Sequence, residues 1–534
     1  MQLCFKWYNI KRDNVGCYMA GTSFLMHTIS TFGIILFSKL IGFIREMIMA
    51  GVYGAGALTD AYNSAYSLFY IPVLLFTSCL TSTFQVFYNK SRAELGLDGA
   101  KRFSNSVISL FALFALAVSG IMFAFAEGIV KNVFAGFSNE KVQAATEYLR
   151  IMLPSLIFFT VAIIYNELFN ADKRFIAAQL SGLPLSFTLI LTVLLFSGGA
   201  GLRAQAWGVA AAGVIQVIIS ALLIRRSYVF KPSLKIFDPR IRRLLAASVP
   251  AVLSMAVTEL NHIIDRSLAS GLNSGDITAM TYAFKLVSVF IGIGVVPLTT
   301  VSFASMAKEA AKKGSDGVRD YTDASLRLLL AVLLPAALLC AVSSGDIIRF
   351  AYGRGAFTES NIAVTAGVFL FYILGLPFFG MRDLLSRTMH SLENTRIPMY
   401  AAMISMSVNI GLNLWLRTVM GVNGLAFSTV IAALVNVLLL GISVSKRVKN
   451  IFNRAFIIEG IKTLVSAIVM LACALVLSSV LPKASSCLGA LIRFGATALI
   501  CFAVYTGVCF ALRVKAYTEL MLYVFSKFKR LIKH

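Results

Sequence analysis

Charged side chains interrupt several long apolar runs of this sequence. In the first run, Lys39 and Glu46 fall on one helical face with Arg45 about a third of a turn away, and Asp60 opens the next run. An ionised side chain in the middle of a bilayer costs about 2.5–3.5 kcal/mol, so such charges usually face a cavity or a partner. These four residues are therefore candidate ligand-binding groups.

A second set of charges occurs later in the chain. Glu259, His262 and Arg266 share one face of an expected helix, and Asp265 lies beside them. Lys285 lies inside the following apolar run. Arginine and lysine bind phosphate groups well where the dielectric constant is low. A mostly cationic site of this kind favours an anionic ligand over a metal ion or a neutral solute.

Simpler structural roles remain open for some of these residues. Arg45 with Glu46, and Asp265 with Arg266, lie near helix ends, where they could pair locally or extend toward the headgroups. His262 could be a hydrogen-bonded interior residue and not a proton relay. Lys285 is harder to explain in this way, because its apolar run continues on both sides.

The composition indicates that membrane helices position these charges. Of the 534 residues, 58% are hydrophobic and 13% are charged, which is typical of a membrane protein. A spanning helix needs roughly 20 apolar residues. The sequence therefore predicts an all-α polytopic membrane protein of about fourteen transmembrane helices, at residues 23–45, 61–88, 103–127, 145–168, 175–197, 207–224, 244–268, 277–305, 328–344, 361–381, 398–416, 423–445, 461–481 and 489–512.

An internal repeat predicts how these helices are organised. The pattern G-x-D-G-x-(K/R)-x-(F/Y)-(S/T)-(N/D) occurs at residues 96–105 and again at 314–323. Each copy would hold about six helices, and such parallel repeats suit two pseudo-symmetric lobes that rock about a central site. The expected parts are an N-terminal cytoplasmic tail at 1–22, an N-lobe at 23–226, a C-lobe at 227–446, and two further helices with a basic C-terminal tail at 447–534.

The basic residues predict the orientation in the membrane. The net charge is +24, and most of the 48 Lys and Arg residues lie in alternate loops and at the two ends of the chain, most densely at 225–243 and 446–454. By the positive-inside rule these loops and both termini are cytoplasmic, so the charge sets topology and does not indicate nucleic acid. The eight Cys residues have no paired spacing, so no disulfide framework or metal site is expected.

Two segments of the first helices carry a family resemblance. Residues 38–46 (SKLIGFIRE) and 54–62 (GAGALTDAY) strongly resemble the opening signature of the MurJ (MviN) lipid II flippases, which belong to the MOP superfamily of flippases and drug exporters. Supporting matches are 265–271 (DRSLASG), 282–286 (YAFKL), 352–358 (YGRGAFT) and 394–398 (NTRIP). The resemblance implies two lobes, alternating access and a cationic cavity that binds the pyrophosphate of an undecaprenyl-linked muropeptide.

The resemblance also implies roles for individual residues. Arg45 matches a cavity arginine of the family, Glu46 its acidic neighbour and Asp60 the acid of an outer loop. Lys39 and Lys285 stand where the family usually has arginine. A lysine keeps the charge but loses the bidentate geometry of arginine.

Two positions depart from the family pattern. A further family arginine and a nearby acid would fall near Val73 and Ser78, so part of the cationic set is missing. This departure keeps open a flippase for another polyprenyl-diphosphate-linked oligosaccharide, because such a protein would keep the fold and vary the cavity. It also keeps open a catalytically silent scaffold.

The expected function is a flippase that moves lipid II from the inner to the outer leaflet of the bacterial cytoplasmic membrane. A cation-coupled drug exporter would require acidic cavity residues, and the sequence has no Walker A, HExxH, GxSxG or DDxxD pattern for an enzyme. No cofactor is expected, and the membrane potential or a monovalent cation could supply the drive. The expected partners are the polyprenyl-pyrophosphate lipid, membrane lipids and cell-wall synthesis proteins. The predicted substrate-binding residues are Lys39, Arg45, Glu46, Asp60, Glu259, Asp265, Arg266 and Lys285.

Overall fold

Helices account for all the regular structure that can be described. The computed structural model describes residues 37–196, 201–233, 238–448, 451–482, 484 and 486–532. Within these residues there is no strand, and twelve helical stretches are long and apolar enough to cross a membrane. Both findings confirm the predicted all-α polytopic membrane protein.

The longest helix contains two of the expected spans. Helix α3, Ala57–Ala124, has 68 residues, about twice what a tilted helix needs to cross a bilayer. Its backbone breaks at Gly96, where φ is 69° and ψ is −172°. The expected spans 61–88 and 103–127 both lie in α3. The first expected span, 23–45, lies mostly outside the described residues, which show a helix over 37–53. The number fourteen stays a prediction.

The chain divides into two compact units. Unit 1 comprises residues 1–46, 72–123 and 151–252, and unit 2 comprises 47–71, 124–150 and 253–534. The units follow packing and not the sequence repeat, so the predicted lobes 23–226 and 227–446 and the segment 447–534 stay predictions. The predicted tail at 1–22 lies outside the described residues.

Unit 1 is built around the greater part of α3. Aromatic side chains of α3 and α6 form its core, including Phe84, Phe103, Phe111 and Phe169. The rings of Phe84 and Phe103 are 5.9 Å apart. The remaining helices are the 3-10 turn η2 (Leu153–Ser155), α6 (Leu156–Ala171), α7 (Phe175–Leu180), α8 (Leu183–Phe196), α9 (Gly201–Ile224) and the first part of α10 (Pro239–Ala269).

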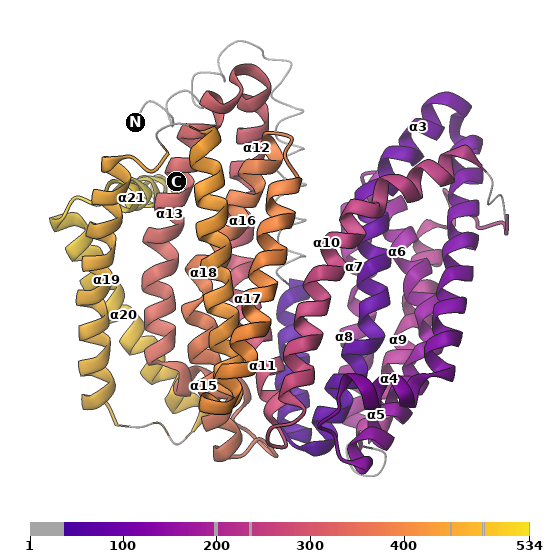
Figure 1. The fold of residues 1–534 in the computed structure, drawn as a ribbon, viewed down its shortest axis with the longest axis horizontal. Helices are drawn as coiled ribbons and strands as arrows, with labels where there is room; N and C mark the ends of the chain where they lie inside the picture. The colour runs from indigo at the N-terminus through magenta and orange to yellow at the C-terminus, as the bar shows by residue number, and fades with distance from the viewer. Residues whose placement is uncertain are drawn as a thin grey trace. The chain divides into compact units, whose positions relative to one another are not determined.

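Unit 2 holds the rest of α10 and the helices that follow it (Figure 1). A π-helical segment, η3 (Ile291–Val295), separates α11 (Asp276–Phe290) from α12 (Val296–Lys313). Such a segment often occurs at functional sites. The other helices are α4 (Ala126–Val133), α5 (Asn139–Met152), α13 (Ser315–Val342), α14 (Ser344–Tyr352), α15 (Glu359–Leu374), α16 (Leu376–Ser391), α17 (Arg396–Met420), α18 (Val422–Arg447), α19 (Arg454–Val480), α20 (Cys487–Ala511) and α21 (Lys515–Ile532).

An ion pair and two hydrogen bonds connect the last three helices to α13 and to each other. The Oε2 atom of Glu459 lies 2.6 Å from Nη1 of Arg327, and its Oε1 accepts a 2.7 Å hydrogen bond from the backbone N–H of Ala516. The hydroxyl of Tyr505 donates to the carbonyl of Ala331 at 2.7 Å. These contacts join α13, α19, α20 and α21, so the two spans beyond the sequence repeat are an integral part of unit 2.

Candidate functional site

Arg45 and Glu46 form a local ion pair in unit 1. The Nη2 atom of Arg45 lies 2.6 Å from Oε1 of Glu46, and its Nη1 lies 3.5 Å from Oγ of Ser186 in α8. Glu46 is buried, with 5% of its surface exposed. Lys39, earlier on the same helix, is exposed. The local pairing of Arg45 with Glu46, which the sequence left open, is therefore present. The predicted substrate-binding role of Lys39, Arg45 and Glu46 stays a prediction.

Asp60 caps the start of helix α11. Its carboxylate accepts hydrogen bonds from the backbone N–H groups of Gly275 at 2.6 Å and Thr278 at 2.9 Å, and from the Thr278 hydroxyl at 2.7 Å. The Nζ atom of Lys141 lies 3.5 Å away, and only 1% of Asp60 is exposed. A carboxylate at a helix N-terminus satisfies free N–H groups and stabilises the helix dipole. We call Asp60, Lys141, Gly275 and Thr278 the Asp60 cluster.

The glycine at this helix start allows the close approach. Gly275 has φ of 98°, a conformation that side-chain-bearing residues rarely adopt, and a Cβ added there would lie 2.8 Å from the carbonyl oxygen of Ala55. The Asp60 cluster therefore depends on glycine at this position.

Asp265 is also buried and hydrogen-bonded. Its Oδ1 accepts from Nδ2 of Asn413 at 2.6 Å, and the Ser428 hydroxyl donates to Oδ1 of Asn413. Only 3% of Asp265 is exposed. Arg266 is half-buried on the next position of α10, and Glu259 and Asp265 both interact with it electrostatically. The predicted charges of α10 are thus largely compensated by one another and by amides.

The remaining predicted residues contact aromatic rings. Lys285 places Nζ 5.8 Å from the ring centre of Tyr282, a cation–π contact. The His262 ring lies 5.2 Å from that of Phe284. His262 of α10 and Phe284 of α11 also line a hollow inside unit 2. The candidate residue His262 therefore lies at a cavity.

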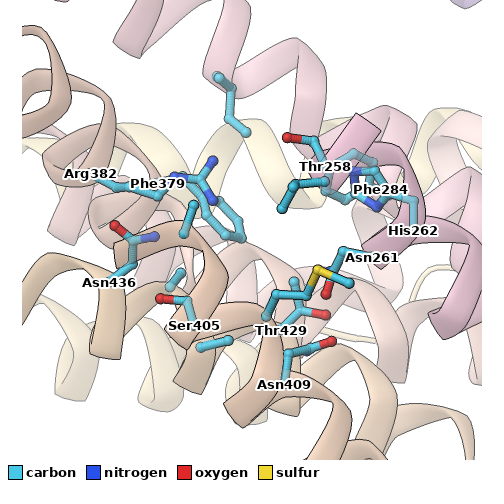
Figure 2. Close-up of a pocket in the computed structure, with 16 residues that line it drawn as sticks. Thr258, Asn261, His262, Phe284, Phe379, Arg382, Ser405, Asn409, Thr429 and Asn436 are labelled. Atoms are coloured by element: carbon cyan, nitrogen blue, oxygen red, sulfur yellow. The ribbon is translucent and has the colours of Figure 1, made fainter. Parts of the chain in front are cut away.

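The hollow in unit 2 is polar and contains no acidic residue in its lining. Its volume is about 140 Å³, enough for several water molecules or a small polar group. Figure 2 shows Arg382 and Asn436 on one side and Thr258 and His262 on the other. The full lining is Val257, Thr258, Asn261, His262, Phe284, Ile291, Phe379, Arg382, Ala402, Ser405, Met406, Asn409, Thr429, Ala432, Ala433 and Asn436. We call this cavity the Arg382 hollow.

Sequence reasoning missed Arg382 and the amides around it. Arg382 follows directly on the expected span 361–381, so the sequence places it just outside a membrane helix, but it lies within α16. The available signal was the presence of Asn409 and Asn436 inside apolar helices, because uncharged amides in spans also usually face polar partners or cavities.

The predicted site residues fall into separate places. Lys39, Arg45 and Glu46 belong to unit 1, whereas Asp60, Glu259, Asp265, Arg266 and Lys285 belong to unit 2. The convergence of Arg45 with Lys285 on one cavity stays a prediction, since the two residues belong to different units. In the part of the chain that the structure describes, no three His, Cys, Asp or Glu side chains gather as metal ligands.

Comparison with known proteins identifies the family. The family model described as "Lipid II flippase MurJ" matches residues 49–493. A probable lipid II flippase MurJ of Rhizobium meliloti (strain 1021) is 30% identical over 76% of this chain and 78% of that protein. One from Rhizobium tropici is 27% identical over 82% of this chain and 84% of that protein.

Solved structures show the same fold. A lipid II flippase MurJ in an inward closed conformation matches with a TM-score of 0.75 and 24% identity, over 92% of this chain and 100% of that chain. An inward-facing multidrug resistance MATE family transporter of the MOP superfamily matches with a TM-score of 0.67 and 12% identity, over 78% of this chain and 96% of that chain. With the family model covering most of its length, this multi-pass membrane protein belongs to the lipid II flippase MurJ family.

Proposed function

We propose that this chain is a flippase that moves lipid II, an undecaprenyl-pyrophosphate-linked peptidoglycan precursor, from the inner to the outer leaflet of the bacterial cytoplasmic membrane. The observation that carries the proposal is membership of the lipid II flippase MurJ family across residues 49–493. On this proposal the chain is a transporter and not an enzyme, and it serves cell-wall synthesis.

The cationic side chains of the apolar helices bind the cargo in this proposal. Lys39, Arg45, Arg266 and Lys285 contact the phosphates, and Glu46, Glu259, Asp265 and Asp60 hold these cations and the helix ends in place. A diphosphate carries its charge on oxygens that match lysine and arginine donors. The predicted N-lobe and C-lobe then alternate between access to the cytoplasmic and the outer side.

Replacing the cationic residues tests this binding site. Arg45→Ala and Lys285→Ala should each abolish rescue of cells depleted of their own lipid II flippase, because the phosphates lose a counter-charge. Lipid II exposure on the outer leaflet and the amount of protein in the membrane are measured in the same cells. Full exposure in both variants would remove these residues from the site.

The energy for export comes from the membrane potential or from a monovalent cation. An inside-negative potential favours outward movement of an anion by about 2.3 kcal/mol per charge per 100 mV. Collapsing the potential with a potassium ionophore should slow export if the potential drives it. Replacing the external and internal sodium at constant potential should slow export if the cation drives it.

The proposed orientation places both termini in the cytoplasm. The basic loops around 225–243 and 446–454 support it through the positive-inside rule. A reporter enzyme that is active only in the cytoplasm, fused after His534, should be active. An inactive fusion of a chain that still rescues depletion would reverse the orientation.

Depletion rescue also separates this function from its main alternative. A flippase for another polyprenyl-diphosphate-linked oligosaccharide would fail to rescue, although it would be made and inserted. Rescue with lipid II exposed on the outer leaflet supports the proposed cargo. Binding to cell-wall synthesis proteins would be tested separately, by cross-linking in growing cells.

A further inference from the structure

Arg382 is an unusual cation within unit 2. The residue is exposed, it has no ion pair or hydrogen bond with any residue that the structure describes, and its guanidinium lies 5.6 Å from the ring centre of Phe379. The neighbouring Asp383 acts on it electrostatically, but that carboxylate is paired with Arg387. Arg387, on the same helix, differs. Its Nε lies 3.0 Å from Oδ2 of Asp383, and it also contacts the ring of Phe303 at 5.9 Å. The same helix thus carries one compensated arginine and one available for an external anion.

Two buried polar groups in the same hollow also have no partner among the described residues. The Oδ1 atom of Asn436 and the Oγ atom of Ser405 are buried without a hydrogen bond, and the two residues are 5% and 6% exposed. Figure 2 shows both on the same side of the hollow as Arg382. Buried polar groups are normally hydrogen-bonded, so unpaired ones that face a cavity indicate a water or ligand position.

The side chains that line the Arg382 hollow favour a negatively charged ligand. Arg382 brings a full positive charge and five N–H donors, and no Asp or Glu side chain lines the hollow. The Ser405 hydroxyl can donate, and the Asn436 amide can present either its oxygen or its nitrogen after rotation. A cation would be repelled here. An oxyanion would pair with Arg382 and accept hydrogen bonds from the two neighbours.

We infer that the Arg382 hollow is an oxyanion subsite in which Arg382 binds one anionic group of the cargo and Asn436 and Ser405 hydrogen-bond to it. The cargo's identity rests on the proposed function. Two parts of lipid II carry oxyanions of this kind, the lipid diphosphate and the carboxylates of the peptide. Both present oxygen acceptors to a guanidinium, so the geometry assigns the shared chemistry and the experiment distinguishes the source.

The test measures binding of two probes to the purified full-length chain in lipid nanodiscs. One probe is undecaprenyl pyrophosphate, which has the diphosphate without the peptide. The other is the free muropeptide, which has the peptide carboxylates without the lipid. Arg382→Gln should weaken one probe at least tenfold. A loss confined to the first probe assigns the diphosphate to the hollow, and a loss confined to the second assigns a peptide carboxylate.

Further variants keep the result interpretable. Arg382→Lys should fall between the wild type and Arg382→Gln, because it keeps the charge but loses the fork-shaped donor set. Asn436→Leu and Ser405→Ala should each weaken the same probe about threefold. Arg387→Gln is the matched control on the same helix, and it should bind both probes as the wild type does.

Three outcomes overturn the inference. If Arg382→Gln binds both probes as tightly as the wild type while the wild-type chain rescues depletion, the subsite is wrong and the proposed function stands. If Arg387→Gln weakens binding as much as Arg382→Gln, the effect is not specific to the hollow, and the subsite is again wrong. If the wild type neither binds nor rescues, the proposed function fails together with the inference.

Discussion

The Asp60 cluster and the Arg382 hollow are both polar regions inside unit 2. The polar groups of the Asp60 cluster have hydrogen-bond and ion-pair partners, whereas several of those in the hollow have none among the described residues. Each oxygen of Asp60 has a donor from α11 or from Lys141. In the hollow, Arg382 has no ion pair or hydrogen bond with a described residue, since the neighbouring Asp383 pairs with Arg387, and Asn436 and Ser405 each have a buried atom without a partner. A saturated cluster contributes to stability, whereas an unsaturated one of the same size is available to a ligand.

The largest expected effect on stability comes from breaking the saturated cluster. Asp60→Ala should lower the free energy of unfolding by about 3–5 kcal/mol, because it leaves buried Lys141 without a counter-charge and the first turn of α11 without acceptors. Denaturant or thermal unfolding in detergent measures the change. Asp60→Asn, which keeps one acceptor, should cost less. An unchanged unfolding midpoint for Asp60→Ala would show that the cluster contributes nothing.

Glu459 is a second carboxylate whose oxygens both have partners, and its replacement should lower the free energy of unfolding by a smaller amount. Glu459→Ala should lower the free energy of unfolding by about 2–3 kcal/mol, since Arg327 loses one of two acidic partners but keeps Asp323 at 2.9 Å. Limited proteolysis should cut the variant earlier near α21. If the protease cuts the variant and the wild type at the same rate, Glu459 does not stabilise the packing of the last helices.

Replacing an unpaired polar residue of the Arg382 hollow should instead raise the free energy of unfolding. Asn436→Leu should raise the free energy of unfolding by about 1 kcal/mol, because it removes a buried amide oxygen that has no partner. The same variant should transport more slowly. A loss of stability with normal transport would place Asn436 with the structural residues and contradict the contrast between the two regions.

The positions of most membrane helices along the chain could be predicted from the apolar runs, because a helix that spans a bilayer needs a continuous apolar segment. The charges on α10 and α11 were also recognisable, because they interrupt such runs. The partners of Asp60 were not, since Gly275 and Thr278 are distant in sequence and use backbone N–H groups that leave no pattern. Arg382 was missed because it follows the last apolar residue of its run, where an arginine that lines a hollow and an arginine in a loop look alike in sequence.

The most direct test of this account compares transport and stability in one variant. Arg382→Gln and the wild type are reconstituted in proteoliposomes with lipid II, and the lipid reaching the opposite leaflet is measured beside the unfolding midpoint of each protein. The account predicts at least a tenfold loss of transport, with stability within about 0.5 kcal/mol of the wild type because Arg382 has no described hydrogen bond to lose. Unchanged transport would contradict it.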